Sequence, residues 1–103
     1  MSRFLVTTEA RADLFAFWEH IAEDSLDAAD KVIREIEDSF SKLAEMPGIG
    51  HSRKDLLDQR YKFWSVYSYV IAYRWEASPI QIIAVVRGAR DLDAFFGRRE
   101  NIQ

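Results

Sequence analysis

The chain has 103 residues, of which 49% are hydrophobic and 14% aromatic, the composition of a folded protein with room for one core. It contains no cysteine, which excludes disulfides and thiolate metal sites. No stretch approaches the roughly 20 apolar residues of a membrane helix, and the N-terminal apolar run is too short for a signal peptide. We therefore expect a single soluble domain over residues 1–103, located in the cytoplasm and without a membrane partner.

The net charge of −3 is distributed unevenly along the chain. Residues 1–50 carry 5 Lys and Arg against 11 Asp and Glu, a net −6, whereas residues 51–103 carry 9 against 6, a net +3. Such a division can serve two partners of different charge, or it can arise because helices are solvated by acidic side chains. The charge distribution alone is compatible with both interpretations.

The first half of the chain predicts a short strand followed by two helices. Residues 3–7 are apolar enough for the strand, and Thr7-Thr8-Glu9 supply an N-cap and an acidic first turn for a helix. The apolar stripe of this helix, at positions i, i+3, i+4 and i+7, consists of Leu14, Phe17, Trp18 and Ile21. A second helix is predicted to begin after Ser25 and to end at Met46-Pro47-Gly48. Two long helices joined so tightly form an antiparallel hairpin.

The second half changes to the two-residue period of strands. Residues 47–58 predict a loop, and alternating side chains then run from Arg60 to Ser65 and from Tyr67 to Trp75. A third run, Ile80 to Arg87, is rich in β-branched residues. Asp91 is an acceptable N-cap for a short helix through Phe96. The order β-α-α-β-β-β-α predicts an α+β fold of two layers, with the αα-hairpin packed on an antiparallel sheet.

The order of elements and three local sequences resemble the RelE/ParE toxin superfamily, from Arg3 to about Phe96. The sequences that carry the resemblance are TEARADL at 8–14, YVIAYR at 69–74 and IIAVVRGARDL at 82–92. Many members have a His-Gly-x-Arg-Asp string in the last of these, where this chain has Arg87 in place of the histidine. The resemblance implies a toxin held in a hetero-oligomer by a cognate, ParD-like antitoxin.

The superfamily divides by target. RelE-like members are ribosome-dependent ribonucleases that cleave messenger RNA in the ribosomal A site, whereas ParE-like members inhibit DNA gyrase and so replication. Metal-free RNA cleavage needs a base, an acid and cations around the phosphate. The residues that would form such a catalytic site are Arg60, Lys62, Arg87 and Arg90. Arginine is a poor base because it is effectively always protonated, and neither His20 nor His51 has a partner at a recognisable spacing. The sequence therefore favours a protein that is not an enzyme.

The isoelectric point of about 5.3 also argues against docking on ribosomal RNA, which favours basic proteins. We therefore favour a ParE-like inhibitor with DNA gyrase as its target, which does not itself bind a specific DNA sequence. Arginine is well suited to protein interfaces, and the candidate target contacts are Arg74, Arg87, Arg90, Arg98 and Arg99. For Arg90-Asp91, a local salt bridge with a helix cap is the competing interpretation. A RelE-like messenger RNA endoribonuclease is the alternative, and an inactive relative that only binds its antitoxin is a second.

The chain has 3 Trp, 7 Phe and 4 Tyr, more than so small a core needs, and some are expected to line a groove for the antitoxin. An antitoxin of this type is expected to lay an amphipathic helix and an extended strand on its toxin. Trp18 and Trp64 are the candidates for this groove, whereas Phe17 and Phe40 are assigned to the core. No His, Asp and Glu set has metal-ligand spacing, and Gly48-Ile49-Gly50 lacks the continuation of a nucleotide-binding loop, so neither a metal nor a cofactor is expected.

Overall fold

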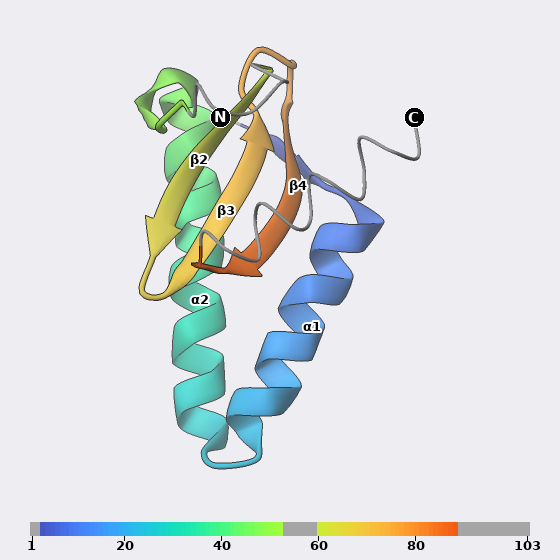
Figure 1. The fold of residues 1–103 in the computed structure, drawn as a ribbon, viewed down its shortest axis with the longest axis vertical. Coiled ribbons are helices and arrows are strands. Elements are labelled where there is room, and N and C mark those ends of the chain that lie inside the picture. Colours follow the sequence, from blue (N-terminus) through green and yellow to red (C-terminus); the bar gives the residue numbers. More distant parts are fainter. Residues whose placement is uncertain (1–2, 53–59, 89–103) are drawn as a thin grey trace.

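The computed structural model describes residues 3–52 and 60–88 (Figure 1). The elements, in chain order, are β1 (Phe4–Val6), α1 (Thr8–Ala22), α2 (Leu26–Glu45), the 3-10 helix η1 (Pro47–Ile49), β2 (Tyr61–Val66), β3 (Tyr69–Arg74) and β4 (Ile80–Arg87). This order confirms the predicted α+β fold with a helical hairpin on a sheet. The short helix predicted from Asp91 lies outside the described residues.

Both predicted N-caps are present. The Thr7 hydroxyl accepts a hydrogen bond from the Ala10 N–H at 3.2 Å, and the Ser25 hydroxyl accepts one from the Ala28 N–H at 3.1 Å. Each cap satisfies one of the backbone N–H groups that the first turn of a helix leaves without a partner. Helix α2 ends at Glu45, directly before Met46 and Pro47, as the sequence predicts. Among the described residues, no helix is both long and apolar enough to span a bilayer.

The sheet has four strands in the order β1-β4-β3-β2. Strands β2, β3 and β4 form the predicted antiparallel meander, but β1 pairs with β4 in parallel, with Phe4 opposite Ile80. The sheet is therefore mixed, whereas the sequence predicted an antiparallel one. A strand of three residues carries too few side chains to indicate its partner or its direction, and the hairpin that follows it decides both.

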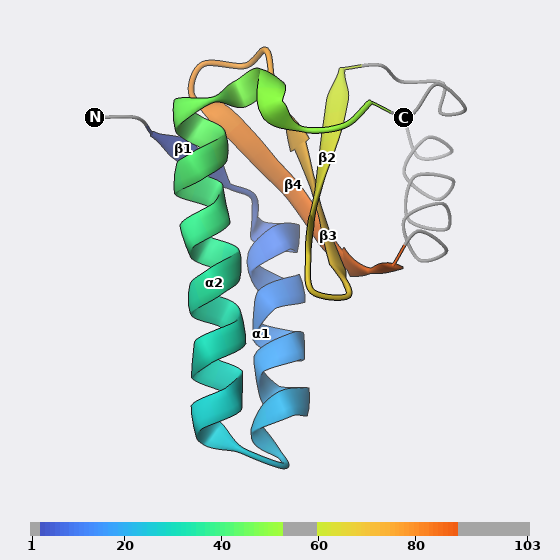
Figure 2. The ribbon, with the colours of Figure 1, turned by 90° about the vertical axis from the view of Figure 1, so that its left-hand side faces the viewer.

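The two helices cover one face of the sheet (Figures 1 and 2). The core between these layers joins α1 and α2 to alternate residues of the strands, and its buried members are Ala10, Ile36, Phe40, Leu43, Tyr69, Ile71, Tyr73, Ile80, Ile82 and Val85. A second buried cluster lies on the opposite face and consists of Phe63, Ala72, Ile83, Ala84 and Val86. Both faces of the meander therefore carry apolar side chains.

Helix α1 lies along the edge of β4 beyond the end of β1. Tyr73 pairs with Ile82 but Ala72 pairs with Ala84, so Ile83 is an extra residue that forms a β-bulge. The Thr7 N–H donates to the Ile82 carbonyl at 3.1 Å, and the Thr7 hydroxyl donates to the Ile83 carbonyl at 3.1 Å. One turn further, Asp13 Oδ2 accepts a hydrogen bond from the Val85 N–H at 3.0 Å. Two side chains at the start of α1 thus replace the strand that β4 lacks on this side.

We predict that Asp13→Ala lowers the free energy of unfolding by about 1.5–3 kcal/mol, because it leaves a part-buried N–H of Val85 without its charged acceptor. Asp13→Asn keeps an acceptor oxygen and is expected to lose roughly half as much. Urea unfolding monitored by circular dichroism measures both. The control is Asp38→Ala on the exposed surface of α2, expected to change stability by less than about 0.5 kcal/mol. Equal losses for Asp13→Ala and Asp38→Ala would contradict the role of Asp13.

Candidate functional site

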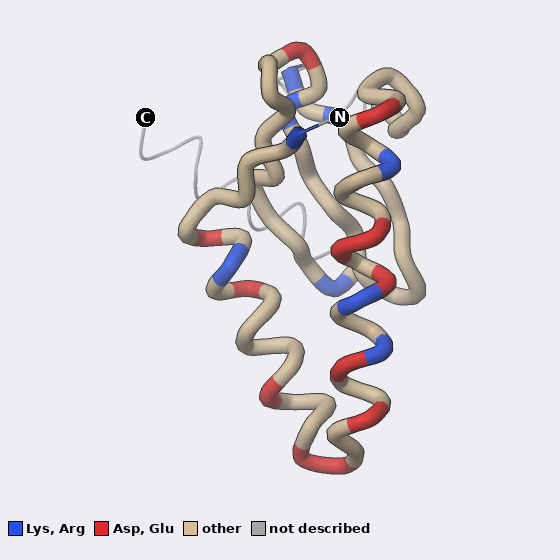
Figure 3. The backbone as a smooth tube through the Cα atoms, turned by 180° about the vertical axis from the view of Figure 1, so that it is seen from behind, with Lys and Arg blue, Asp and Glu red and all other residues tan. Residues whose placement is uncertain are grey.

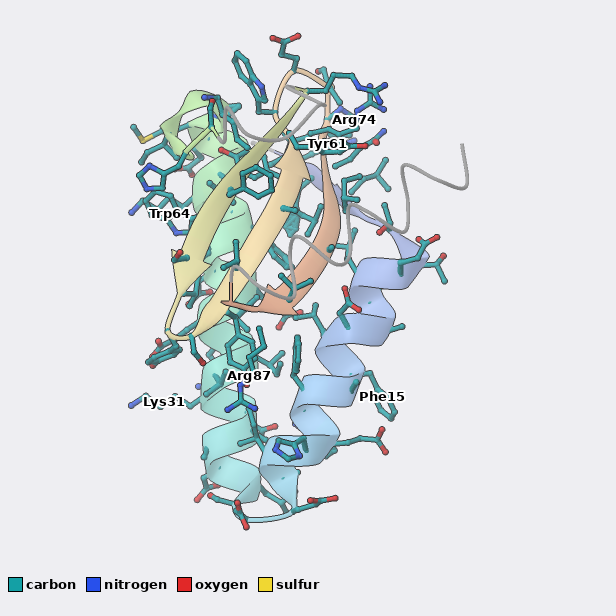
Figure 4. All side chains as sticks on the ribbon, in the orientation of Figure 1. Phe15, Lys31, Tyr61, Trp64, Arg74 and Arg87 are labelled. Carbon is teal, nitrogen blue, oxygen red and sulfur yellow. The ribbon has the colours of Figure 1, made fainter. Side chains whose placement is uncertain are left out.

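The predicted target-contacting arginines do not form one surface. In the β3–β4 ladder Arg74 pairs with Gln81, whereas Arg87 pairs with Tyr69 at the other end. Five residues of strand separate the two ends, which is roughly 17 Å at about 3.3 Å per residue. Figure 4 shows Arg74 and Arg87 at opposite ends of the sheet. The other three candidates, Arg90, Arg98 and Arg99, lie outside the described residues.

Three of the predicted cations lie at one corner of the sheet, the end where β2 begins and β3 ends, with Lys62 and Arg74 on opposite faces. Tyr61 pairs with Arg74, and Lys62 pairs with Tyr73, so Arg60 lies next to this pair. Lys62 Nζ lies 4.7 Å from the centroid of the Trp75 ring and donates to Ser52 Oγ at 3.1 Å.

The proposed nuclease set is divided by this arrangement. Arg60 and Lys62 lie at the corner, Arg87 lies at the far end of β4, and Arg90 lies outside the described residues. Cations so far apart do not converge on a single phosphate, which is what stabilisation of a crowded phosphorane requires. Within residues 3–52 and 60–88, no three His, Cys, Asp or Glu side chains are grouped so as to hold a metal ion.

Trp64 lies on β2, the edge strand of the sheet, and it is half-buried. Lys42 of α2 places its Nζ 4.8 Å from the centroid of the Trp64 ring, a cation–π distance. The His51 ring is stacked on the same indole, with centroids 6.1 Å apart and planes at 9°. The backbone of His51 is held against β2 by two hydrogen bonds of 2.8 Å with Phe63. Trp64 therefore lies at an edge of the sheet between a lysine of α2 and the ring of His51.

A buried tyrosine fixes the segment that carries His51. The Tyr73 hydroxyl donates to the Pro47 carbonyl at 2.7 Å and accepts from the Gly50 N–H at 3.0 Å. Burial raises the pKa of the Tyr73 hydroxyl above its ordinary value, and the hydrogen bond from Gly50 opposes this shift. A Cβ at Gly50 would collide with this hydroxyl, so the close approach requires glycine. Sequence alternation places Tyr73 in a strand but does not indicate this contact.

Trp18 lies on a different surface, between the two helices. Its indole N–H donates to Asp30 Oδ1 of α2 at 2.9 Å. The neighbouring cavity, which we call the hairpin groove, has a volume of about 270 Å³ and is lined by Arg11, Leu14, Phe15, Trp18, Ile33 and Glu37. Trp18 thus lines a groove between the helices and Trp64 lies at an edge of the sheet, so the two predicted antitoxin-binding residues lie on different surfaces.

Phe15 is the exposed aromatic residue of the groove, and it was not among the residues predicted to bind the antitoxin. It lies outside the i, i+3, i+4 stripe, and 61% of its surface is exposed, with the ring projecting from α1 into solvent (Figure 4). The signal was the run Leu14-Phe15 next to Phe17-Trp18, which makes α1 apolar over more than one face. Figure 3 shows many Asp and Glu positions along both helices. The hairpin groove is therefore an apolar strip on an acidic surface.

Comparison with known proteins assigns the chain to a family. Residues 4–92 match the model of the ParE toxin of the type II toxin-antitoxin system, parDE. The chain belongs to the ParE toxin family. This confirms the predicted superfamily and its ParE-like branch, and it makes the chain a toxin of a type II toxin-antitoxin system.

A solved structure of the chromosomal ParDE toxin-antitoxin system from P. aeruginosa contains a similar chain. The two share 21% sequence identity with a TM-score of 0.70, over 85% of this chain and 97% of that one. At this identity the likeness establishes the ParE fold and does not extend to the residues of a site. No curated protein matches the sequence.

We predict that Tyr73→Phe lowers the free energy of unfolding by about 1–3 kcal/mol at neutral pH, because Pro47 and Gly50 lose their hydrogen-bond partner. The same variant tests the raised pKa. Above pH of about 10 the unfolded chain loses the Tyr73 proton first, so the stability that the neutral hydroxyl contributes is complete below that pH and is lost as the pH rises towards the folded pKa.

Urea unfolding at pH 7, 9, 10 and 11 measures both effects. Wild-type stability is expected to fall more steeply above pH 10 than that of Tyr73→Phe. Tyr61→Phe, which changes a second strand tyrosine, is the control for the general effect of removing a phenol. If the stability of wild type and Tyr73→Phe declined in parallel over this range, the buried hydroxyl would not be the group responsible.

Proposed function

We propose that this ParE-family toxin inhibits DNA gyrase, and so DNA replication, until a cognate antitoxin neutralises it. The observation that carries the proposal is the match to the ParE family over residues 4–92, since the resemblance to ParE-like toxins implies this target. The separation of Arg87 from Arg60 and Lys62 supports it, because it disfavours the RelE-like alternative of RNA cleavage. On this proposal the chain breaks no bond, and its arginines bind the target.

The hairpin groove supports an antitoxin partner that binds through an amphipathic helix. Leu14, Trp18 and Ile33 provide apolar contact along the groove, while Arg11 and Glu37 at its border can pair with polar residues of that helix. Phe15 adds a large exposed aromatic ring, the type of side chain that dominates binding energy at interfaces. The solved relative belongs to a ParDE system, in keeping with such a partner.

The edge of β2 supports a second contact, with an extended segment. The N–H and C=O of Phe63 point out of the sheet towards His51, and the two-residue period of a strand directs those of Ser65 the same way. Among the described residues, His51 alone pairs with this side of β2. An antitoxin strand added here would continue the sheet beyond the isolated bridge.

The target is tested by inducing the chain in bacterial cells and by adding the purified protein to a gyrase supercoiling assay. We expect DNA synthesis to stop before RNA and protein synthesis, cells to form filaments, and supercoiling to be inhibited. Arg87→Glu is expected to weaken inhibition at least roughly tenfold, because Arg87 is an exposed arginine suited to an interface. Arg34→Glu on the exposed surface of α2 is the charge-matched control and is expected to inhibit normally.

Each other outcome points to a different function. Immediate arrest of protein synthesis with A-site cleavage of messenger RNA would replace gyrase by the RelE-like activity. Normal growth with a folded protein that still binds its antitoxin would identify an inactive relative. Full inhibition by folded Arg87→Glu would remove Arg87 from the gyrase contact.

The antitoxin contact is tested separately by Phe15→Asp. Because this side chain is exposed, the substitution is expected to leave the fold intact and to weaken binding of a ParD-like antitoxin by at least about tenfold, measured by titration calorimetry. Leu26→Asp is a matched control, since Leu26 is also 61% exposed but does not line the hairpin groove. Equal affinities of the two variants would place the antitoxin helix elsewhere.

A further inference from the structure

A small cavity lies at the corner where β2 begins and β3 ends. Tyr61 pairs with Arg74 there, and Figure 4 shows both side chains at this corner. Arg60, Arg74, Glu76 and Ala77 line the cavity, which has a volume of about 240 Å³. Neither the hairpin groove nor the Arg87 end of β4 shares a residue with it.

Arg74 has a buried donor that no group in the described part of the chain accepts. Its neighbours Tyr73 and Trp75 pack towards the helices, so strand alternation places Arg74 on the opposite face, where it is half-buried. Its Nε is buried and has no hydrogen-bond partner within residues 3–52 and 60–88. A guanidinium is charged at any physiological pH, and buried charged donors in folded proteins are almost always paired. An external anionic group is the kind of partner that accounts for such an atom.

The second arginine of the cavity makes an oxyanion the matching ligand. The Arg60 guanidinium carbon lies 5.8 Å from the centroid of the Tyr61 ring, which keeps this cation beside Arg74. Planar guanidinium groups donate pairs of parallel hydrogen bonds to carboxylates and phosphates. Glu76 lines the same cavity, so its described lining residues carry a formal charge of +1, from two arginines and one glutamate. A single carboxylate suits this charge better than a polyphosphate chain, which gains affinity from many cations in a row.

We propose that the cavity of Arg60 and Arg74 binds one carboxylate group of a protein partner, an Asp or Glu side chain. The proposal goes beyond the proposed function, because carboxylate binding at this corner can be measured on the isolated toxin without gyrase or antitoxin. Failure of gyrase inhibition and failure of carboxylate binding are therefore separate results.

The test follows the arginine Nε–H signals of the full chain by NMR while N-acetylglutamate α-amide, which has one carboxylate, is added at constant ionic strength. The Arg74 Nε–H signal is expected to move saturably with a dissociation constant in the millimolar range, about 1 to 10 mM. Arg34 on α2 is the internal control and is expected to show no saturable shift. Arg74→Lys keeps the positive charge but loses the paired donors of the guanidinium. Binding of the carboxylate probe, reported by the Ala77 amide signal, is therefore expected to weaken at least roughly fivefold.

Four results would overturn the proposal. The first is an Arg74 shift no larger than that of Arg34, and the second is an equal shift with chloride, either of which means that the cavity does not recognise a carboxylate. The third is binding of inorganic phosphate more than about tenfold tighter than the carboxylate probe, which would identify a phosphoryl ligand instead. Undiminished binding by Arg74→Lys would show that the guanidinium fork is not the recognition element.

Discussion

The hydrogen bonds that join Thr7 and Asp13 to the edge of β4 fix the position of the helices relative to the sheet. Strand β1 covers β4 only as far as Ile82, and the bulge at Ile83 then disturbs the regular ladder. Each buried backbone N–H or C=O of this edge would lower the free energy of unfolding if it had no hydrogen-bond partner. Since α1 provides their partners, its first two turns cannot slide along the sheet. The hairpin groove, which α1 and α2 form together, takes its position from the same contacts.

Tyr73 is a comparable constraint at the other side of the molecule. Its hydroxyl holds the turn after α2, and that turn brings His51 to the edge of β2 and on to Trp64. Lys42 approaches the same indole from the last turn of α2. The contacts of Lys42 and His51 with Trp64 therefore depend on where α2 ends, which Pro47 determines, and on Tyr73, a strand residue far away in the sequence. A substitution of Tyr73 would therefore alter the position of His51 beside Trp64, although Tyr73 does not itself lie at that edge of the sheet.

Local chemistry explains which features the sequence could predict. Caps at Thr7 and Ser25, the stop at Pro47 and the alternation of three strands are each set by neighbouring residues, and each is confirmed. Pairing and register depend on residues far apart, so the parallel direction of β1, the bulge at Ile83 and the role of Asp13 had no local signal. For the same reason the sequence could group candidate site residues only by their type, such as arginines or tryptophans. In the structure the β3–β4 ladder separates Arg74 from Arg87, and Trp18 and Trp64 lie on different surfaces.

The charge asymmetry now has a structural basis that favours two partners. The acidic half of the chain contains the helical hairpin, along which Figure 3 shows many Asp and Glu positions, whereas Arg60 and Arg74 line the corner cavity. Solvation explains acidic helices but does not explain two arginines that line one cavity. Arg87 lies at the opposite end of β4, opposite Tyr69, whose ring is 4.7 Å from that of Phe17 in α1. The hairpin groove shares no lining residue with the corner cavity. On the proposed function, an antitoxin helix in the hairpin groove and a carboxylate in the corner cavity would therefore occupy separate surfaces of the toxin.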